Sequence, residues 1–180
     1  MESKAVKHLA NIKINDEYGT PISLFLEACG KYNCTPQVDY FASEVNHVCD
    51  EYYTKSDDAF SRSWTSNGFI NPPYSRKLMP KVMQKAYEEH KKNNIELMIL
   101  AYSKTDTKWW WNYVENCPTC EVHFIKGRIK FLDAKGYQTK LPAPYPSVWI
   151  IYRKQMAWNP QVITTTQQMF PNYKKYHHAK

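Results

Sequence analysis

The segment 95–101 constrains the fold more than any other part of the chain. It is almost wholly apolar, whereas a strand with one solvated face alternates apolar and polar residues. A strand that is apolar on both faces is typical of the centre of a parallel sheet that helices cover on both sides. The segment therefore predicts a buried central strand.

Other segments alternate between strand-like and helix-like patterns. In the first helix we expect Thr20 to be the N-cap and Pro21 to be the first helical residue. The apolar residues Val82, Met83 and Ala86 lie at positions i, i+1 and i+4, which is typical of one face of an amphipathic helix. The expected strands are 37–42, 68–70, 122–125 and 148–152, and the expected helices are 22–32, 79–92 and 107–114. This order predicts an α/β fold with a mostly parallel sheet and helices on both faces.

Length and charge narrow the class of protein. The 180 residues are enough for one domain, and we expect a polar arm over 1–19, a compact domain over 20–153 and a basic tail over 154–180. A net charge of +7 suits a polyanionic partner such as DNA. No apolar run reaches the length of a membrane span, and no secretory signal is visible near Met1. The odd number of cysteines, five, favours reduced thiols in a cytoplasm.

The tetrapeptide Asn71-Pro72-Pro73-Tyr74 follows the predicted strand 68–70 directly. Open α/β sheets bind ligands at the carboxyl ends of their strands. The prolines fix two φ angles and remove two N–H donors, so the neighbouring carbonyls and the Asn71 amide are held in one arrangement. Asn71 and the Pro72 carbonyl can each accept a hydrogen bond from an amino group, and Tyr74 offers a flat face to a planar ring. The pattern predicts a socket for the exocyclic amine of a nucleobase; a proline-rich turn after an edge strand is the alternative.

Such a socket suits methyl transfer to an aromatic amine. The lone pair of that nitrogen is delocalised into the ring, and two acceptors that bind both amine hydrogens draw the nitrogen toward a tetrahedral state. The methyl group of S-adenosylmethionine is already activated by its sulfonium, so we expect neither a metal nor a strong base. The acceptors act by positioning and by preorganised electrostatics, and loss of one such group costs about 3 to 4 kcal/mol in the barrier.

Two cysteines, Cys117 and Cys120, have the spacing of a metal-binding pair, and His123 follows them. A structural zinc site needs four ligands, usually from two such pairs. Because the other three cysteines form no second close pair, we favour a turn between a helix and a strand.

Further motifs accompany the socket from Thr20 to Arg153. In chain order they are Thr20-Pro21 with Leu24-Phe25, Val38-Asp39-Tyr40-Phe41-Ala42-Ser43 followed by Asn46, Tyr53-Thr54, Asp58-Ala59 with Trp64, Asp106-Thr107-Lys108-Trp109-Trp110, Gly127-Arg128-Ile129-Lys130-Phe131 and Pro142-Ala143-Pro144-Tyr145-Pro146-Ser147. Together with the socket, this ordered set resembles the phage-type DNA adenine-N6 methyltransferase family, often called phage Dam. The resemblance covers roughly three quarters of the chain.

The resemblance implies a compact Rossmann-like methyltransferase with S-adenosylmethionine as donor and adenine in DNA as acceptor. It implies that Thr20 and Pro21 lie near the methionine part of the donor. Asp39, Ala42 and Ser43 take the place of the first cofactor motif, and Asp58 takes that of an acid that contacts the cofactor adenine. Phe41-Ala42-Ser43 replaces the usual glycine-rich loop. From the residues alone, Asp39 can also be a helix cap for the next element, and Asp57-Asp58 can be the N-cap and first-turn acid of a helix through Trp64.

Two groups of residues, one aromatic with a lysine beside it and one basic, are candidates for nucleic-acid binding. Trp109 and its two tryptophan neighbours cannot all face one side of a helix, so at least one is exposed; beside Lys108, such a ring can stack on a base. Core packing is the alternative for at least two of the three. Lys126, Arg128 and Lys130 alternate, which places three cations on one face for phosphate contacts or on an ordinary solvated edge.

Two other functions remain open at this point. The stretch 38–43 with Asn46 also faintly resembles ribonuclease-H-like segments of some retroelements, and a metal-dependent nuclease would need converging carboxylates such as Asp39, Asp58 and Asp106. A catalytically inactive DNA-binding relic of a methyltransferase is the third hypothesis. The sequence shows no separate target-recognition domain, so we expect specificity to come from loops around the socket and from 103–147.

Overall fold

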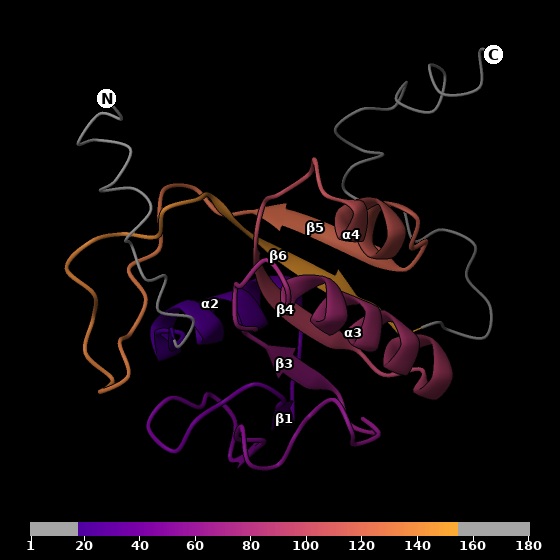
Figure 1. Ribbon diagram of the computed structural model, residues 1–180, viewed down its shortest axis with the longest axis horizontal. Coiled ribbons are helices and arrows are strands. Elements are labelled where there is room, and N and C mark those ends of the chain that lie inside the picture. The colour runs from indigo at the N-terminus through magenta and orange to yellow at the C-terminus, as the bar shows by residue number, and fades with distance from the viewer. Residues whose placement is uncertain (1–17, 155–180) are drawn as a thin grey trace, which may run out of the picture.

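A single six-stranded sheet organises the protein. The computed structural model describes residues 18–154, and the strands lie in the order β2-β1-β3-β4-β6-β5 (Figure 1). Their bounds are β1 Val38–Asp39, β2 Glu51–Tyr52, β3 Gly68–Ile70, β4 Leu97–Tyr102, β5 Cys120–Phe124 and β6 Ser147–Tyr152.

The sheet is mostly parallel, as predicted, but it is mixed. Strands β2, β1, β3 and β4 are joined by parallel pairings. Strand β6 runs antiparallel to both β4 and β5, so β5 points the same way as β4. Among the described strands β6 is therefore the one that is reversed.

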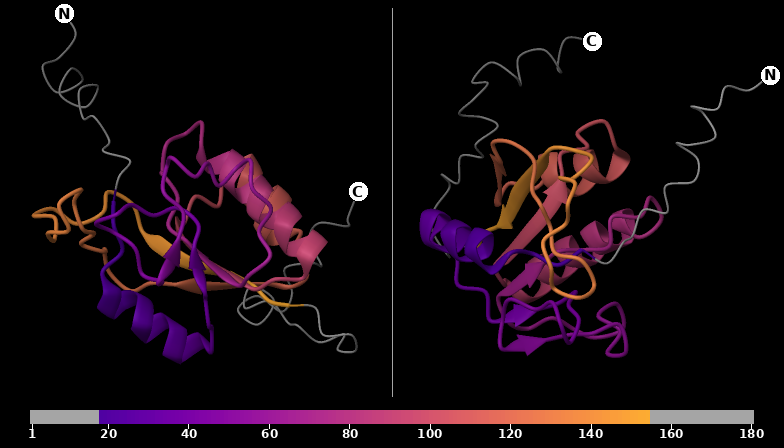
Figure 2. Two further views of the ribbon diagram at one scale, coloured as in Figure 1. Left: turned by 90° about the horizontal axis from the view of Figure 1, so that it is seen from below. Right: turned by 90° about the vertical axis from the view of Figure 1, so that its left-hand side faces the viewer.

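Helices cover both faces of the sheet, which confirms that prediction. Helix α2 (Ile22–Tyr32) lies on one face, whereas α3 (Met79–Asn93) and the segment of α4 (Lys108–Trp110) and η1 (Trp111–Glu115) lie on the other (Figure 2). The η1 turn has π-helical geometry and continues α4 directly. None of the helices between residues 18 and 154 combines the length and apolar character that crossing a membrane requires.

Strand β4 is the buried centre that the apolar run predicted. All six of its residues are buried, and they alternate between two cores: Leu97, Ile99 and Ala101 pack under α3, while Met98 and Leu100 pack under α2. The strand begins at Leu97 rather than at residue 95, and the preceding Glu96 forms an ion pair with Arg153, in which Oε2 lies 2.9 Å from Nη1.

Several boundaries differ from the sequence predictions for local reasons. Helix α2 begins after Pro21, whose carbonyl accepts the Phe25 N–H at 3.2 Å, and Thr20 is not its N-cap. The strand expected over 37–42 is only Val38–Asp39, because the chain turns after Asp39 and the Ala42 N–H bonds to the Tyr53 carbonyl at 2.9 Å. The short β2 was not predicted.

Two smaller predictions concern the edges of the domain. Cys117 and Cys120 flank a turn between η1 and β5, as favoured, and all five cysteines are free thiols. Gly19, the last residue of the predicted arm, forms an isolated bridge with Leu132. The remaining parts of the predicted arm and tail, 1–17 and 155–180, lie outside the described residues.

Candidate active site

The Asn71 side chain lies immediately beyond the carboxyl end of β3 and is held in a defined orientation. It is only 8% exposed, and its Nδ2 donates a hydrogen bond to the Tyr18 carbonyl at 2.6 Å. Because a carbonyl can only accept, the amide nitrogen must face Tyr18. The acceptor Oδ1 therefore faces the opposite side, which is the orientation that binding an amine requires.

The Tyr74 hydroxyl currently occupies that acceptor. Its oxygen lies 2.8 Å from Asn71 Oδ1 and 3.1 Å from the Leu100 carbonyl, both of which can accept its hydrogen. The Tyr74 ring stacks on Tyr102 with a centroid distance of 4.1 Å, and burial raises the pKa of its phenol well above the usual value. The face that the sequence suggested for a base is thus covered on one side by another tyrosine.

The two prolines complete a rigid corner between Asn71 and Tyr74. Pro72 is buried and Pro73 is half-buried. Since neither carries a backbone N–H, the corner presents acceptors and no donors at these two positions.

The segment Tyr18–Thr20, which supplies the Tyr18 carbonyl, is fixed from two sides. Gly19 exchanges two backbone hydrogen bonds with Leu132, of 2.9 and 2.8 Å. It also packs so closely on Asn46 that a Cβ at Gly19 would lie 2.4 Å from the Asn46 side chain. Sequence reasoning missed the Tyr18 carbonyl, because a backbone acceptor leaves no signal in residue types.

Asp39 ends β1, and its partner in the neighbouring strand β3 is Phe69, two residues before Asn71. The carboxylate is 3% exposed and accepts the N–H groups of Phe41 at 3.3 Å and Val48 at 3.2 Å. Burial raises the pKa of Asp39 to about 7, and the two N–H donors oppose that rise. In this structure Asp39 shapes the loop 40–48 rather than capping a helix.

That loop contains the residues expected in place of a glycine-rich motif. The Phe41 ring packs edge-on against Phe60 and Trp64, at 5.5 and 6.0 Å, so its bulk joins an aromatic cluster. The Ser43 hydroxyl accepts the Asn46 N–H at 3.1 Å. Side chains therefore stiffen a loop that glycines would leave mobile.

Thr20 and Asp58 differ in their surroundings. Thr20 is buried, and its hydroxyl has no hydrogen-bond partner within the described residues. Asp58 is exposed, has a φ of 49° and accepts the Phe60 N–H at 3.3 Å. It belongs to a run of turns, and the helix considered as an alternative for the residues through Trp64 does not form.

Two of the three consecutive tryptophans pack in the core, as the core-packing alternative expected. Trp109 and Trp110 are each 5% exposed and lie in the core, whereas Trp111 is 38% exposed. Lys108 is exposed at the start of α4. Because the Trp109 ring is buried, a base could stack on it only after the residues around it move. Trp111 is the tryptophan of this run that faces solvent.

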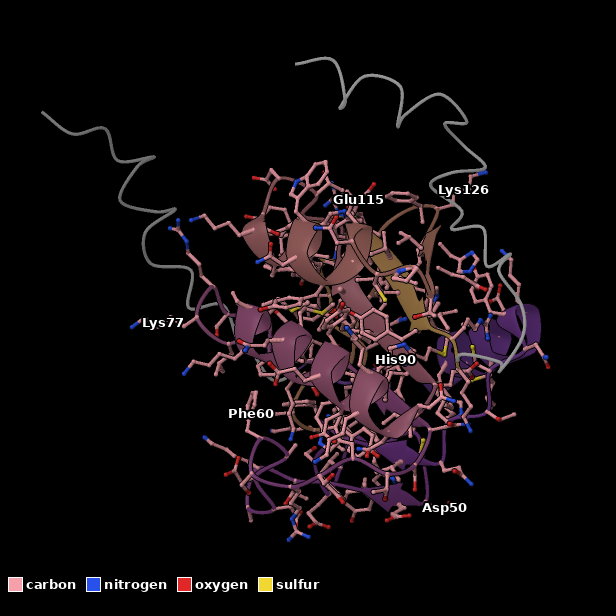
Figure 3. All side chains as sticks on the ribbon, turned by 90° about the vertical axis from the view of Figure 1, so that its right-hand side faces the viewer. Asp50, Phe60, Lys77, His90, Glu115 and Lys126 are labelled. Carbon is pink, nitrogen blue, oxygen red and sulfur yellow. The ribbon has the colours of Figure 1, made fainter. Side chains whose placement is uncertain are left out.

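Lys126, Arg128 and Lys130 all lie at the surface, and Lys126 extends away from the body of the molecule (Figure 3). They line a shallow groove of about 290 Å³ together with Pro21 and the first turn of α2. Arg128 differs from the two lysines because its Nη1 donates to the carbonyls of Ala143, at 3.2 Å, and of Pro144. Arg128 therefore also holds the backbone before β6.

The sequence matches proteins of known family. A family model described as DNA N-6-adenine-methyltransferase (Dam) matches residues 8–173. The chain belongs to this family. A Dam-family relative, the DNA N-6-adenine-methyltransferase of Escherichia phage T1, is 31% identical over an alignment of 130 residues that covers 69% of this chain and 51% of that protein. The chain thus spans about half the length of this relative.

Dam-family membership and the geometry both disfavour the nuclease hypothesis. Within residues 18–154 no three His, Cys, Asp or Glu side chains gather closely enough to hold a metal ion. Asp39 is bound to loop N–H groups, and Asp58 and Asp106 are exposed.

Proposed function

We propose that this protein is a Rossmann-like, adenine-specific DNA methyltransferase that uses S-adenosylmethionine. The observation that carries the proposal is the Asn71 amide, whose nitrogen is held by the Tyr18 carbonyl at 2.6 Å so that its oxygen serves as an acceptor. Asn71 would orient the adenine N6, which would receive the methyl group and release one proton to solvent, while the donor would leave as the neutral thioether. When bound, the donor supplies the activated methyl group.

The base-binding role follows from the acceptors at the end of β3. Asn71 Oδ1 and the Pro72 carbonyl would accept the two amine hydrogens of adenine. Asn71 Oδ1 first has to lose the Tyr74 hydrogen bond, and the Leu100 carbonyl, 3.1 Å away, is an alternative acceptor for that hydroxyl. Because one hydrogen bond replaces another, the exchange costs little. Pro73 keeps the corner rigid, and the exposed part of the Tyr74 ring would contact the base.

The donor-binding role is supported by a polar atom that lacks a partner among residues 18–154. A buried hydroxyl without a hydrogen bond costs about 1 to 3 kcal/mol, and within those residues the Thr20 hydroxyl has no partner. The amino-acid end of a methyl donor offers charged groups that would satisfy it. We therefore assign Thr20 and Pro21 to the amino-acid end of the donor. From the family resemblance we assign Ala42 and Ser43, in the loop that Asp39 organises, to the centre of the donor. Asp58 is assigned to the adenosine of the donor.

The nucleic-acid role rests on the surface cations. An adenine in a duplex must leave the base stack to reach a buried Asn71, and phosphate contacts hold the DNA during that change. We assign Lys126 and Lys130 to contacts with DNA phosphates. Arg128 would contact a phosphate while it holds the protein backbone before β6. Lys108 and the surface of the adjacent tryptophans would contact a nucleotide that flanks the target. Given the phage relative, we further propose a phage-encoded enzyme acting in the host cytoplasm.

Asn71→Ala tests the proposal. The variant should bind S-adenosylmethionine within a few-fold of wild type, yet methylate DNA about a hundredfold or more slowly, because it lacks a transition-state acceptor. Donor binding is measured by calorimetry, and turnover by transfer of labelled methyl groups to DNA. Near wild-type turnover in this variant would remove Asn71 from the site.

A further inference from the structure

The segment between β5 and β6 folds back on itself as an irregular hairpin, which we call the β5–β6 hairpin (residues 126–146). Its two arms are joined by backbone hydrogen bonds from Ala143 to Ile129, 2.7 Å, and from Thr139 to Phe131, 2.8 Å. At the turn, Asp133 Oδ1 accepts the N–H groups of Lys135 and Tyr137. The hairpin is drawn in orange and projects beyond the sheet (Figure 1).

The inner side of the β5–β6 hairpin is anchored at the socket. Ile129, Phe131 and Ala143 are buried. The Phe131 ring lies 5.8 Å from that of Tyr74, and Tyr145, at the end of the second arm, lies 5.4 Å from Tyr102. Both arms therefore contact the pair of stacked tyrosines, so the position of the hairpin is fixed relative to Asn71.

The outer side carries the two most exposed large apolar side chains of the described residues. Leu141 is 80% exposed and Tyr137 is 70% exposed. Leu141 lies between the hydrogen-bonded pairs Phe131–Thr139 and Ile129–Ala143, on the arm opposite Lys130. A leucine held in water on a well-anchored backbone gains nothing from folding, because its burial is what stabilises.

Positive charge surrounds these two side chains. The cations of the hairpin are Lys126, Arg128, Lys130, Lys135 and Lys140. The carboxylate of Asp133, the one acidic residue in 126–146, is used by the turn. Exposed apolar side chains set among cations match duplex DNA, where phosphates flank an apolar base stack.

We propose that Leu141 is a wedge that enters the DNA at the position that the target adenine vacates. This inference rests on the proposed function, since a gap in the stack exists only if a base is extruded. Apolar side chains are used in this way by proteins that unstack base steps. The anchoring of the hairpin to Tyr74 and Tyr102 would place the wedge and the socket on one rigid frame.

The test compares Leu141→Ser with Leu141→Met on two DNA duplexes. Both carry the site mapped by sequencing bacterial genomic DNA after methylation by the wild-type protein. In one duplex the target adenine is paired with thymine, and in the other it faces an abasic position, where extrusion costs less. A matched control is Leu26→Ser, which changes a leucine that is 59% exposed on α2.

We expect Leu141→Ser to methylate the paired duplex about tenfold more slowly than wild type and the abasic duplex within about twofold. Leu141→Met and Leu26→Ser should resemble wild type on both duplexes, and thermal melting should be the same for all four proteins. An equal loss on both duplexes, or no loss on the paired one, would overturn the wedge. Failure of the wild-type protein to methylate either DNA would instead overturn the proposed function.

Discussion

Replacing Asn71 by aspartate tests whether the Tyr18 carbonyl orients the side chain. A carboxylate is a better acceptor than an amide, so the chemistry of the amine alone would tolerate this change. The geometry does not, because the atom that faces Tyr18 must donate a hydrogen across 2.6 Å. In Asn71→Asp an oxygen would meet an oxygen there, at a site that is 8% exposed.

The expected cost follows from that contact. Loss of a buried hydrogen bond that leaves its partner unsatisfied costs about 1 to 3 kcal/mol, and burial raises the pKa of the new carboxyl above its unfolded value. A raised folded pKa means that the penalty is small below the unfolded pKa and grows as the pH rises through the folded one. When protonated, the carboxyl can again donate to the Tyr18 carbonyl. Asn71→Asp should therefore be about 1 to 3 kcal/mol less stable than wild type at pH 8 and much closer to it at pH 4.

Urea unfolding at the two pH values measures this difference. The control is Asn112→Asp, which changes an exposed asparagine of η1 and should show no such pH dependence. Turnover of Asn71→Asp should fall about tenfold or more, because the acceptor is no longer held in place. If Asn71→Asp matches wild type in stability at pH 8 and in turnover, the orienting role of Tyr18 is refuted.

Three further predictions address other parts of the molecule. Replacing Lys126 and Lys130 together by glutamine should flatten the log–log salt dependence of duplex binding by about two units, as for two lost phosphate contacts; an unchanged slope would make them ordinary solvated cations. Asp39→Asn should weaken S-adenosylmethionine binding by about 1 to 3 kcal/mol in calorimetry, because the loop 40–48 loses one of its two anchoring acceptors; unchanged affinity would separate this loop from the donor. Glu121 pairs with Arg153 and His123, which hold its pKa at about 2, so its stabilisation is present above the unfolded value near 4.5 and is lost as the pH falls toward 2. Glu121→Gln should accordingly lower the melting temperature at pH 7 but not at pH 2, and equal shifts at both values would contradict the pairing.

Patterns that depend on burial predicted most of the fold. The apolar run at 95–101 and the helical spacing at 79–92 gave β4 and α3 to within two residues, because both elements are specified by which faces they bury. The prediction for β1 was too long, since the chain turns after Asp39, whose carboxylate binds the N–H of Phe41 and, nine residues away, that of Val48. Strand β2 has only two residues, which is too short for any periodicity.

The site shows the same division. Residue types predicted the Asn71 acceptor and the rigid proline corner, because each depends on the chemistry of its own side chain. They did not predict that the Tyr74 hydroxyl would occupy Asn71 Oδ1, that Tyr102 would cover the Tyr74 ring, or that a backbone carbonyl would orient the amide. The contacts of Tyr18 with Asn71 and of Tyr102 with Tyr74 join segments that lie far apart in the chain. The Tyr74–Asn71 bond is local, but it depends on the path of the backbone through the two prolines.

Nucleoside analysis after methyl transfer tests the central claim most directly. Unmethylated DNA is incubated with the protein and S-adenosylmethionine that carries a deuterated methyl group, then digested to nucleosides and examined by mass spectrometry. The account predicts deuteromethyl groups on N6 of deoxyadenosine with the wild-type protein, and at least a hundredfold less with Asn71→Ala. Label on cytosine, or no labelled base in any DNA, would contradict it.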